Sequence, residues 1–207
     1  MAEPAYRDDW LPERKGGGAW PAQGQWTYAE YRRLPEDGRR YEVIRGTLFV
    51  TGAPDYDHQF VVHKLHRLLG NPVEENGWGI VLGAPFEVLL PRGIANPVQP
   101  DILFFRTGNG PESGDPSFAG VPDLIVEVLS PSTRRRDEGI KLESYEDAGV
   151  PEYWLVDSKA RTVLVYTLME GRYVELDLFG EEEGVRSMVL PDLRLKAGDL
   201  FPPSRRR

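Results

Sequence analysis

The sequence predicts an α/β fold in which helices flank one mixed β-sheet, with an additional β-hairpin on each side. The periodic segments follow in the order helix, three strands, helix, strand, which is typical of such a sheet. Residues 97–106 and 122–130 are almost continuous in Val, Ile, Leu and Phe, as expected for central strands covered on both faces. The chain has 207 residues, of which 40% are hydrophobic, and no internal repeat, so we expect one core. We therefore expect one domain over residues 25–201, between a flexible arm (1–24) and a basic tail (202–207).

The N-terminal part of this domain predicts a helix and a hairpin. Residues 27–35 favour a short helix, because Thr27 can cap its N-terminus and Glu30 follows three positions later, as in a capping box. Residues 40–52 form two β-rich runs that meet at Gly46, which can take the positive φ of a tight turn.

Two longer helices and the remaining strands complete the predicted fold. Apolar residues recur every three or four positions from Asp57, so we expect a helix that ends at Gly70 and packs on the sheet. Residues 132–149 predict a second helix, capped by Ser or Thr and ended by Gly149. The predicted strands cover residues 78–91, 97–106, 122–130, 152–157, 162–168 and 172–179.

Several functional classes are excluded by what the sequence lacks. Without cysteine there is no thiolate zinc site, disulfide framework or cysteine nucleophile. There is no Gly-rich phosphate loop, no GxSxG nucleophile elbow and no kinase signature. No apolar run is long enough to span a bilayer, and the N-terminus has no signal-like apolar core, so we expect a cytoplasmic protein without membrane contact. The net charge of −8 argues against bulk attraction to nucleic acid, so any such contact must be local.

Two carboxylates lie within otherwise apolar predicted strands. Asp101 interrupts the run VQPDILFF and Glu127 interrupts LIVEVL. A lone buried carboxylate is costly unless it is paired, protonated or bound to a metal. Neighbouring strands lie about 4.8 Å apart, so if these two strands pair, both carboxylates can reach one cation. For each acid alone, the alternative is a salt bridge to an arginine or a position at a strand end.

Lys141 is a third unusual residue. At 100° per residue it lies within the arc of Leu142, Tyr145 and Ala148 and away from the acidic face of its helix. Near a carboxylate pair, such a lysine could neutralise an attacking hydroxide or a phosphoryl oxygen. The alternative is that its stem covers apolar surface while its ammonium reaches water.

Four further side chains are candidates for lining the same site, and one of them, Tyr145, stands four residues after Lys141 on the same predicted helix. Glu42 is a carboxylate in a hydrophobic run and could complete a metal site, although an exposed face of an edge hairpin explains it equally well. His58 falls within the apolar stripe at the start of its helix, so it is either a core histidine or a residue at the mouth of the site. Gln99 stands two positions before the first of the two acids.

Four stretches of the chain carry a family resemblance: RYEVIRGTLFV, VQPDILFF, PDLIVEVLSPSTRRRDEGIKLESYEDAGVPEYWLVD and GRYVEL. Together they resemble the Uma-type restriction endonuclease family, a branch of the PD-(D/E)XK nuclease superfamily, over about residues 27–201. The resemblance implies a restriction-endonuclease-like core, with Asp101 as the acid of the PD element and Glu127 as the acid of (D/E)XK. Leu129 stands where the superfamily has lysine. Related branches move that lysine to the next helix, and Lys141 occupies such a place.

The resemblance also implies a function, the hydrolysis of phosphodiester bonds in DNA by a Mg²⁺-dependent or Mn²⁺-dependent endonuclease. In this hypothesis Asp101, Glu127 and the carbonyl of Val128 hold one or two ions, while Lys141 positions the attacking water. A homodimer would offer two DNA grooves. Three basic residues before the helix could contact flanking phosphates, or could form a solvated turn: Arg134, Arg135 and Arg136.

Two other functions are compatible with the same residues. One is a catalytically inactive, nuclease-like module that binds nucleic acid. The other is a hydrolase that uses Asp101 and Glu127 as an acid/base pair on a sugar or another small substrate, without an essential metal.

Overall fold

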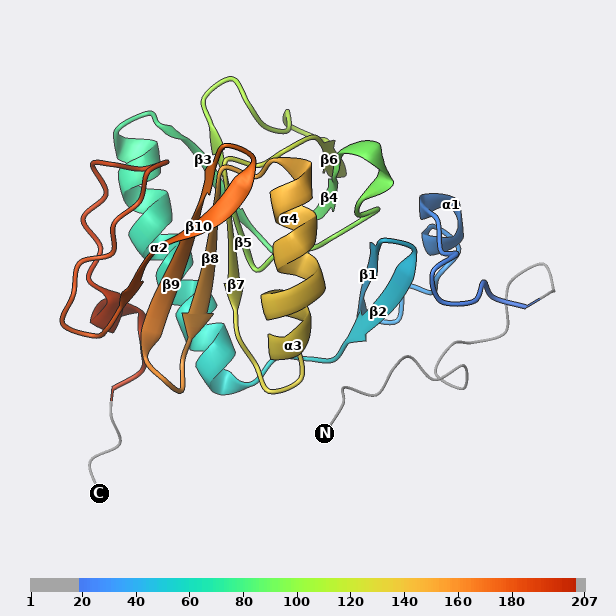
Figure 1. The fold of residues 1–207 in the computed structure, drawn as a ribbon, viewed down its shortest axis with the longest axis horizontal. Helices are drawn as coiled ribbons and strands as arrows, with labels where there is room; N and C mark the ends of the chain where they lie inside the picture. The colour runs from blue at the N-terminus through green and yellow to red at the C-terminus, as the bar shows by residue number, and fades with distance from the viewer. Residues whose placement is uncertain (1–18, 204–207) are drawn as a thin grey trace.

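The computed structural model describes residues 19–203 and confirms the α/β fold: a six-stranded mixed sheet lies between helices (Figure 1). The strand order is β10-β9-β8-β7-β5-β3. Strands β7 and β8 pair in parallel, and the other neighbours in this sheet pair antiparallel. The strands of the sheet are β3 (Gly79–Gly83), β5 (Ile102–Arg106), β7 (Leu124–Val128), β8 (Glu152–Asp157), β9 (Thr162–Met169) and β10 (Arg172–Phe179).

One face of the sheet is covered by the long helix α2 (Tyr56–Glu75). The helix continues past Gly70, where the sequence predicted its end, and contains Pro72. The reason is that the apolar stripe does not stop at Gly70: Val73 lies one turn beyond Leu69 and is fully buried. The burial of this last turn outweighs the low helix propensity of Gly and Pro.

The other face is covered by a helix that changes its winding. It comprises α3 (Arg134–Arg136), a π-helical turn η3 (Asp137–Lys141) and α4 (Leu142–Ala148). Gly149 ends it with a φ of 87°, as predicted for a left-handed C-cap. A π-helical turn is rare in proteins, and those that occur are often found at functional sites. It was not predicted, because hydrophobic periodicity does not distinguish it from an α-turn.

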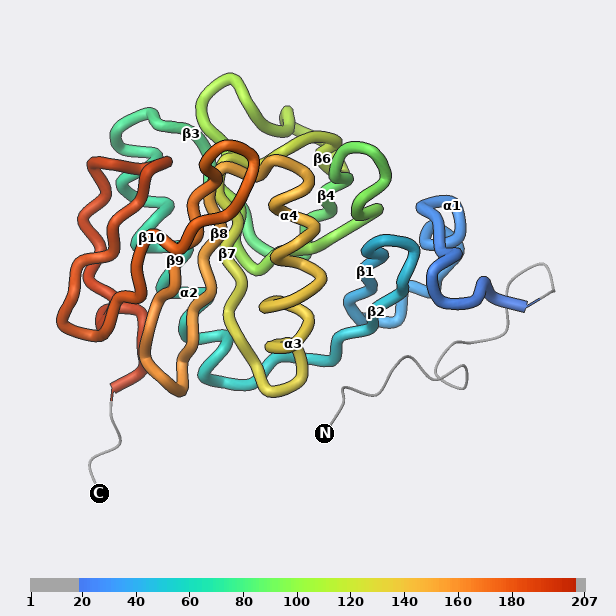
Figure 2. The backbone as a smooth tube through the Cα atoms, viewed as in Figure 1, coloured from blue at the N-terminus to red at the C-terminus, as the bar shows by residue number. Residues whose placement is uncertain are grey.

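The N-terminal elements lie beside the sheet, as Figure 2 shows. Helix α1 (Tyr28–Tyr31) is a single turn whose cap Thr27 accepts a hydrogen bond from the N–H of Glu30, as predicted. The predicted hairpin is also confirmed, with strands β1 (Arg40–Ile44) and β2 (Thr47–Thr51). Its two turn residues, Arg45 and Gly46, both have positive φ, as a type I′ turn requires.

Three predicted strands are shorter than expected, and one of them, 122–130, forms β7 without two residues at each end. Residues 78–91 divide into β3 and β4 (Glu87–Leu89), and β4 pairs in parallel with β6 (Ser117–Ala119), which the sequence did not predict. The run 97–106 forms a strand only from Ile102, because Pro97 and Pro100 have no N–H for a ladder.

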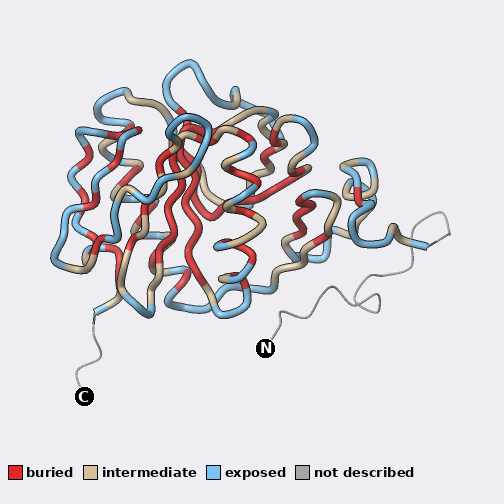
Figure 3. The backbone as a smooth tube through the Cα atoms, in the orientation of Figure 1, coloured by how far each residue is buried: buried red, intermediate tan, exposed pale blue. Residues whose placement is uncertain are grey.

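Burial is greatest along the central strands, drawn in red in Figure 3. The C-terminal segment after β10 adds apolar side chains to the core on the α2 side, among them Leu190 and Leu200, the latter in the short helix η4 (Ala197–Leu200). No helix among residues 19–203 is long and apolar enough to cross a membrane. Most of the predicted arm (residues 1–18) and the end of the predicted tail (204–207) lie outside the described residues.

Candidate active site

The pairing of β5 with β7 brings the two predicted carboxylates together. Ile102, the first residue of β5, pairs with Val126, and extending this antiparallel register by one residue aligns Asp101, just before the strand, with Glu127. Directly opposed residues project on the same face of a sheet, with Cα atoms about 4.5–5.5 Å apart. Oδ2 of Asp101 also accepts a hydrogen bond of 2.9 Å from the N–H of Val128, across the same gap.

Asp101 is buried and surrounded by donors. Nε2 of His58, at the start of α2, donates to Oδ2 at 3.0 Å, and Nη1 of Arg40, at the start of β1, donates to Oδ1 at 2.9 Å. Burial alone would raise the pKa of Asp101, but the hydrogen bond from His58 and the charge of Arg40 outweigh it and hold that pKa well below its usual range. Asp101 is therefore ionised, and the suggested arginine salt bridge exists alongside the acid pair.

Glu127 has the opposite electrostatic environment. Its Oε1 accepts hydrogen bonds from Nζ of Lys141 (2.7 Å) and the hydroxyl of Tyr145 (2.9 Å). No residue in the described part of the chain donates to its Oε2. Burial raises the pKa of Glu127, and repulsion from Asp101 and other acids raises it further. Lys141 lowers it only in part, so the pKa is about 8. An additional cation beside Oε2 would therefore stabilise the ionised form of Glu127.

Lys141 is fully buried and does not reach water. Besides Glu127, its Nζ lies 3.0 Å from Oε1 of Glu42 and 3.7 Å from Oδ1 of Asp137. Burial lowers the pKa of the lysine, but these three carboxylates outweigh burial and raise it overall. Lys141 is therefore protonated, and it joins three acids from three parts of the chain.

Glu42 is not an exposed edge residue but part of a cluster of buried and partly buried charges. The other members of this cluster are Arg40, Asp101, Glu127, Arg136, Asp137 and Lys141. Glu42 is fully buried, and its Oε1 accepts a 2.9 Å hydrogen bond from the N–H of Gln99. Burial would raise its pKa, but Lys141 and Arg136 lower it to about 2. The side-chain amide of Gln99 donates to the carbonyl of Tyr41 at 3.2 Å, so Gln99 holds β1 against the segment that leads to Asp101.

The prediction that three consecutive arginines contact DNA needs a correction. Arg136 is only 3% exposed: Nη1 donates to Thr51 at 3.1 Å and lies 3.5 Å from Oε2 of Glu42. A phosphate on the surface cannot reach it. Arg134 bonds to Asp157 and Glu138, and Arg135 is exposed, so these two stay predictions.

Two residues of the cluster were not identified from the sequence, Arg40 and Asp137. Each had a signal: Arg40 alternates with Glu42 and so shares its face of β1, and Asp137 stands four residues before Lys141. Neither stands out, because Arg40 opens a strand and Asp137 lies in a run of charges that reads as a helix surface.

The oxygen atoms near Asp101 are of the kind that binds a hard divalent cation. Asp101, Oε2 of Glu127 and the carbonyl of Val128 offer oxygen ligands, and Mg²⁺ in proteins commonly takes one or two carboxylates plus waters. In a strand the N–H and C=O of a residue point to the same side, so the Val128 carbonyl faces the side on which its N–H meets Asp101. Within residues 19–203, no group of three or more Asp, Glu or His side chains is arranged to hold a metal. The ammonium of Lys141 occupies the space that three of the acids share.

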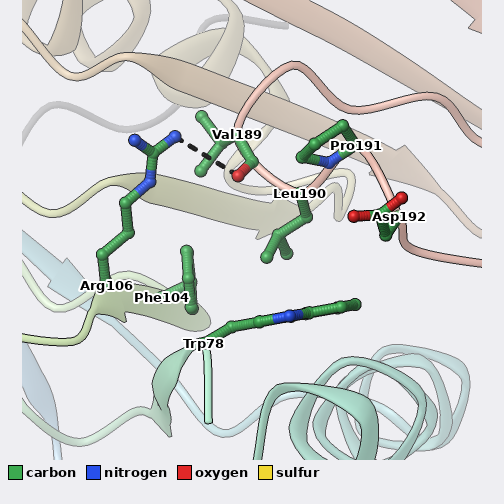
Figure 4. Close-up of a pocket in the computed structure, with 7 residues that line it drawn as sticks. All are labelled: Trp78, Phe104, Arg106, Val189, Leu190, Pro191 and Asp192. Carbon is green, nitrogen blue, oxygen red and sulfur yellow. Dashed lines mark hydrogen bonds between the residues drawn. The ribbon is translucent and has the colours of Figure 1, made fainter. Parts of the chain in front are cut away.

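A pocket elsewhere is a less suitable catalytic site. It has a volume of about 260 Å³ and is lined by Arg106, the last residue of β5 (Figure 4). Asp101 precedes the first residue of the same strand, so the pocket lies at the other end of β5. Nη2 of Arg106 bonds to the carbonyl of Val189 at 3.3 Å, and Asp192 is the single carboxylate of the lining. Its lining residues are Trp78, Phe104, Arg106, Val189, Leu190, Pro191 and Asp192.

Comparisons with known proteins give the family of the chain and agree with its fold. Residues 28–198 match the family model described as "Uma2: Putative restriction endonuclease". A similar fold is found in a crystal structure titled as that of "a putative nuclease belonging to DUF820 from Anabaena variabilis ATCC 29413", with a TM-score of 0.71 and 21% sequence identity. The alignment covers 85% of this chain and 97% of that one, which supports the fold alone. None of the curated proteins compared with the chain matches it.

Proposed function

This chain belongs to the Uma2 family of restriction-endonuclease-like proteins, and from that premise we propose that it is a metal-dependent endonuclease that hydrolyses phosphodiester bonds in DNA. One observation carries the proposal. Asp101 directly precedes β5 and accepts a hydrogen bond from Val128, the neighbour of Glu127 on the adjacent strand β7, and Glu127 is bound by a buried lysine. The family provides the reaction class, and this pair provides a place for it.

The residues that would hold the cation are Asp101, Glu127 and the Val128 carbonyl, because they combine two carboxylates with a neutral oxygen. When bound, Mg²⁺ or Mn²⁺ would lower the pKa of a water and stabilise charge on the phosphate. His58 orients Asp101 through its hydrogen bond to Oδ2. Lys141 acts through Glu127: enclosed by acids, it fixes Oε1 and leaves Oε2 for the cation. This differs from the expectation that Lys141 touches the water directly.

The second candidate is a nucleic-acid-binding module without catalysis. The observation in its favour is that both oxygens of Asp101 already accept hydrogen bonds, from Arg40, His58 and Val128. If this arrangement is permanent, the cluster is a structural ion network and no cation enters.

Calorimetric titration of Mg²⁺ and Mn²⁺, with a plasmid-nicking assay alongside, separates the candidates. Wild type should bind the metal and nick DNA, and Asp101→Asn and Glu127→Gln should each lose both properties. Asp192→Asn is the matched control, since it removes one exposed carboxylate far from the cluster.

Each contrary result has a distinct meaning. Metal affinity that is unchanged in Asp101→Asn and Glu127→Gln would refute the site. DNA binding without nicking would support the inactive module, and hydrolysis of a small substrate that survives EDTA would support an acid/base hydrolase. A labelled RNA added to the same assay tests the preference for DNA.

A further inference from the structure

We propose that Arg40 is the side chain that binds the phosphate of the strand being cut, an inference that rests on the proposed function. The cluster has three permanent cations, and they differ in exposure. The Arg40 side chain is 19% exposed, against 2% for Arg136 and 0% for Lys141. Arg40 is therefore the permanent cation of the cluster that a phosphate can approach from outside.

The hydrogen bonds of these cations also differ. Lys141 is shared by three carboxylates, and Arg136 is held by Glu42 and Thr51. Arg40, in contrast, uses Nη1 for Asp101, and no residue of the described chain accepts a hydrogen bond from its Nε or Nη2. A guanidinium carries five N–H donors in a rigid fork that matches two oxygens of a phosphate. Arg40 thus has donors to spare.

The position of Arg40 fits this role. Its Nη1 lies 2.9 Å from Oδ1 of Asp101, one of the two acids that would hold the cation, so the guanidinium is beside the place where a scissile phosphate must lie. The backbone is fixed, because the N–H of Val43 donates to the carbonyl of Pro97 at 2.9 Å and thereby ties β1 to the segment before Asp101. A fixed backbone with a partly exposed, long side chain allows the guanidinium to exchange Asp101 for a phosphate.

The charge of the cluster requires such a group. Its three permanent cations are already paired with the carboxylates Glu42, Asp101, Glu127 and Asp137, so the cluster offers an incoming phosphate no surplus of positive charge. A phosphodiester that approaches an acidic site is repelled unless a cation meets it. Because the chain as a whole carries a charge of −8, that cation must be local.

The test compares Arg40→Ala and Arg40→Lys with wild type, using Arg172→Ala on β10 as the charge-matched control, 79% exposed at its side chain. The first measurement is the binding of a fluorescent DNA duplex in Ca²⁺ at several salt concentrations. Losing one phosphate contact should lower the slope of log K against log salt by about 0.9 in Arg40→Ala. Arg40→Lys should keep the slope, because it keeps the charge.

The second measurement is cleavage, and the third is calorimetric Mg²⁺ binding. Cleavage should fall by roughly 10²–10³-fold in Arg40→Ala, the effect of losing one donor to a charged transition state, and by less in Arg40→Lys. Metal affinity should be equal or tighter in Arg40→Ala, since the cation that competes for Asp101 is gone. The control should match wild type in all three measurements.

The inference and the proposed function can fail separately. If wild type neither binds metal nor cleaves, the proposed function fails. If wild type does both and Arg40→Ala cleaves normally with an unchanged salt slope, only the role of Arg40 is overturned. Loss of metal binding in a folded Arg40→Ala would also overturn it, because Arg40 would then only support Asp101. If Arg40→Ala does not fold, Arg40→Lys decides: reduced cleavage with an unchanged slope supports the role, and normal cleavage overturns it.

Discussion

Replacing Lys141 with methionine removes the cation that three buried carboxylates share while keeping a side chain of similar length. The ammonium lies 2.7 Å from Glu127 and 3.0 Å from Glu42. Removing one partner of a buried ion pair costs about 3–5 kcal/mol, because the remaining charge is left uncompensated. The pKa of Glu42, about 2 against an ordinary 4.5, corresponds to roughly 3 kcal/mol of stabilisation at neutral pH, with Lys141 as the largest favourable cause. We therefore expect Lys141→Met to lose about 3–5 kcal/mol of unfolding free energy at pH 8.

The loss should depend on pH. In wild type the lowered pKa of Glu42 means that its stabilisation is present above pH 4.5 and disappears as the pH falls toward 2. Without Lys141, burial dominates and the pKa of Glu42 should rise above 4.5, as the pKa of Glu127 already does. A carboxyl with a raised folded pKa loses its stabilising contribution as the pH rises through that value. The difference between wild type and Lys141→Met should thus already be present near pH 5 and should grow toward pH 8.

Urea unfolding followed by tryptophan fluorescence at pH 5, 6, 7 and 8 measures this difference, since Trp154 is fully buried. Lys159→Met is the control, because Lys159 is exposed in the turn between β8 and β9. Adding Glu127→Gln to Lys141→Met should restore part of the loss at pH 8. A loss below about 1 kcal/mol, or one that is the same at every pH, would refute the shared buried cation.

Three further substitutions test other parts of the fold, each followed by urea or thermal unfolding. Glu152→Gln should cost about 1–3 kcal/mol of unfolding free energy, because Oε2 of this buried acid accepts hydrogen bonds from two backbone N–H groups and an amide NH₂ cannot accept them. Glu170→Gln, at an exposed acid, is the control, and equal effects of the two substitutions would argue against the network. Gly149→Ala should cost about 1–2 kcal/mol through its φ of 87°, and Gly149→Asn less; no difference between them would contradict the left-handed cap. Val73→Ala should cost about 1–3 kcal/mol of unfolding free energy, and Glu74→Ala, at an exposed position, almost nothing. Equal small effects would contradict a helix α2 that continues past Gly70.

The sheet could be predicted because its central strands encode their own burial. The runs at β5 and β7 contain almost only apolar residues, and the glycine after Arg45 predicted the tight turn of the β1–β2 hairpin. The predicted end of α2 was wrong. The sequence shows the low helix propensity of Gly70, but the burial of Val73, which extends the helix, depends on the sheet beneath it. The pairing of β4 with β6 depends on residues about 30 positions apart, which no local pattern specifies.

The sequence by itself determined that Asp101, Glu127 and Lys141 are exceptional, because a charge in an apolar context is costly and must have a partner. It did not determine the partners. The pairing of β5 with β7 brought Asp101 to the end of β7 that carries Glu127, and the attachment of β1 to residues 94–97 brought Arg40 to Asp101 across 61 positions of the chain. The same packing buried Arg136, which the sequence placed on the surface. Local pattern identifies a charge within an apolar strand as exceptional, while strand order, register and packing decide which charges are buried together.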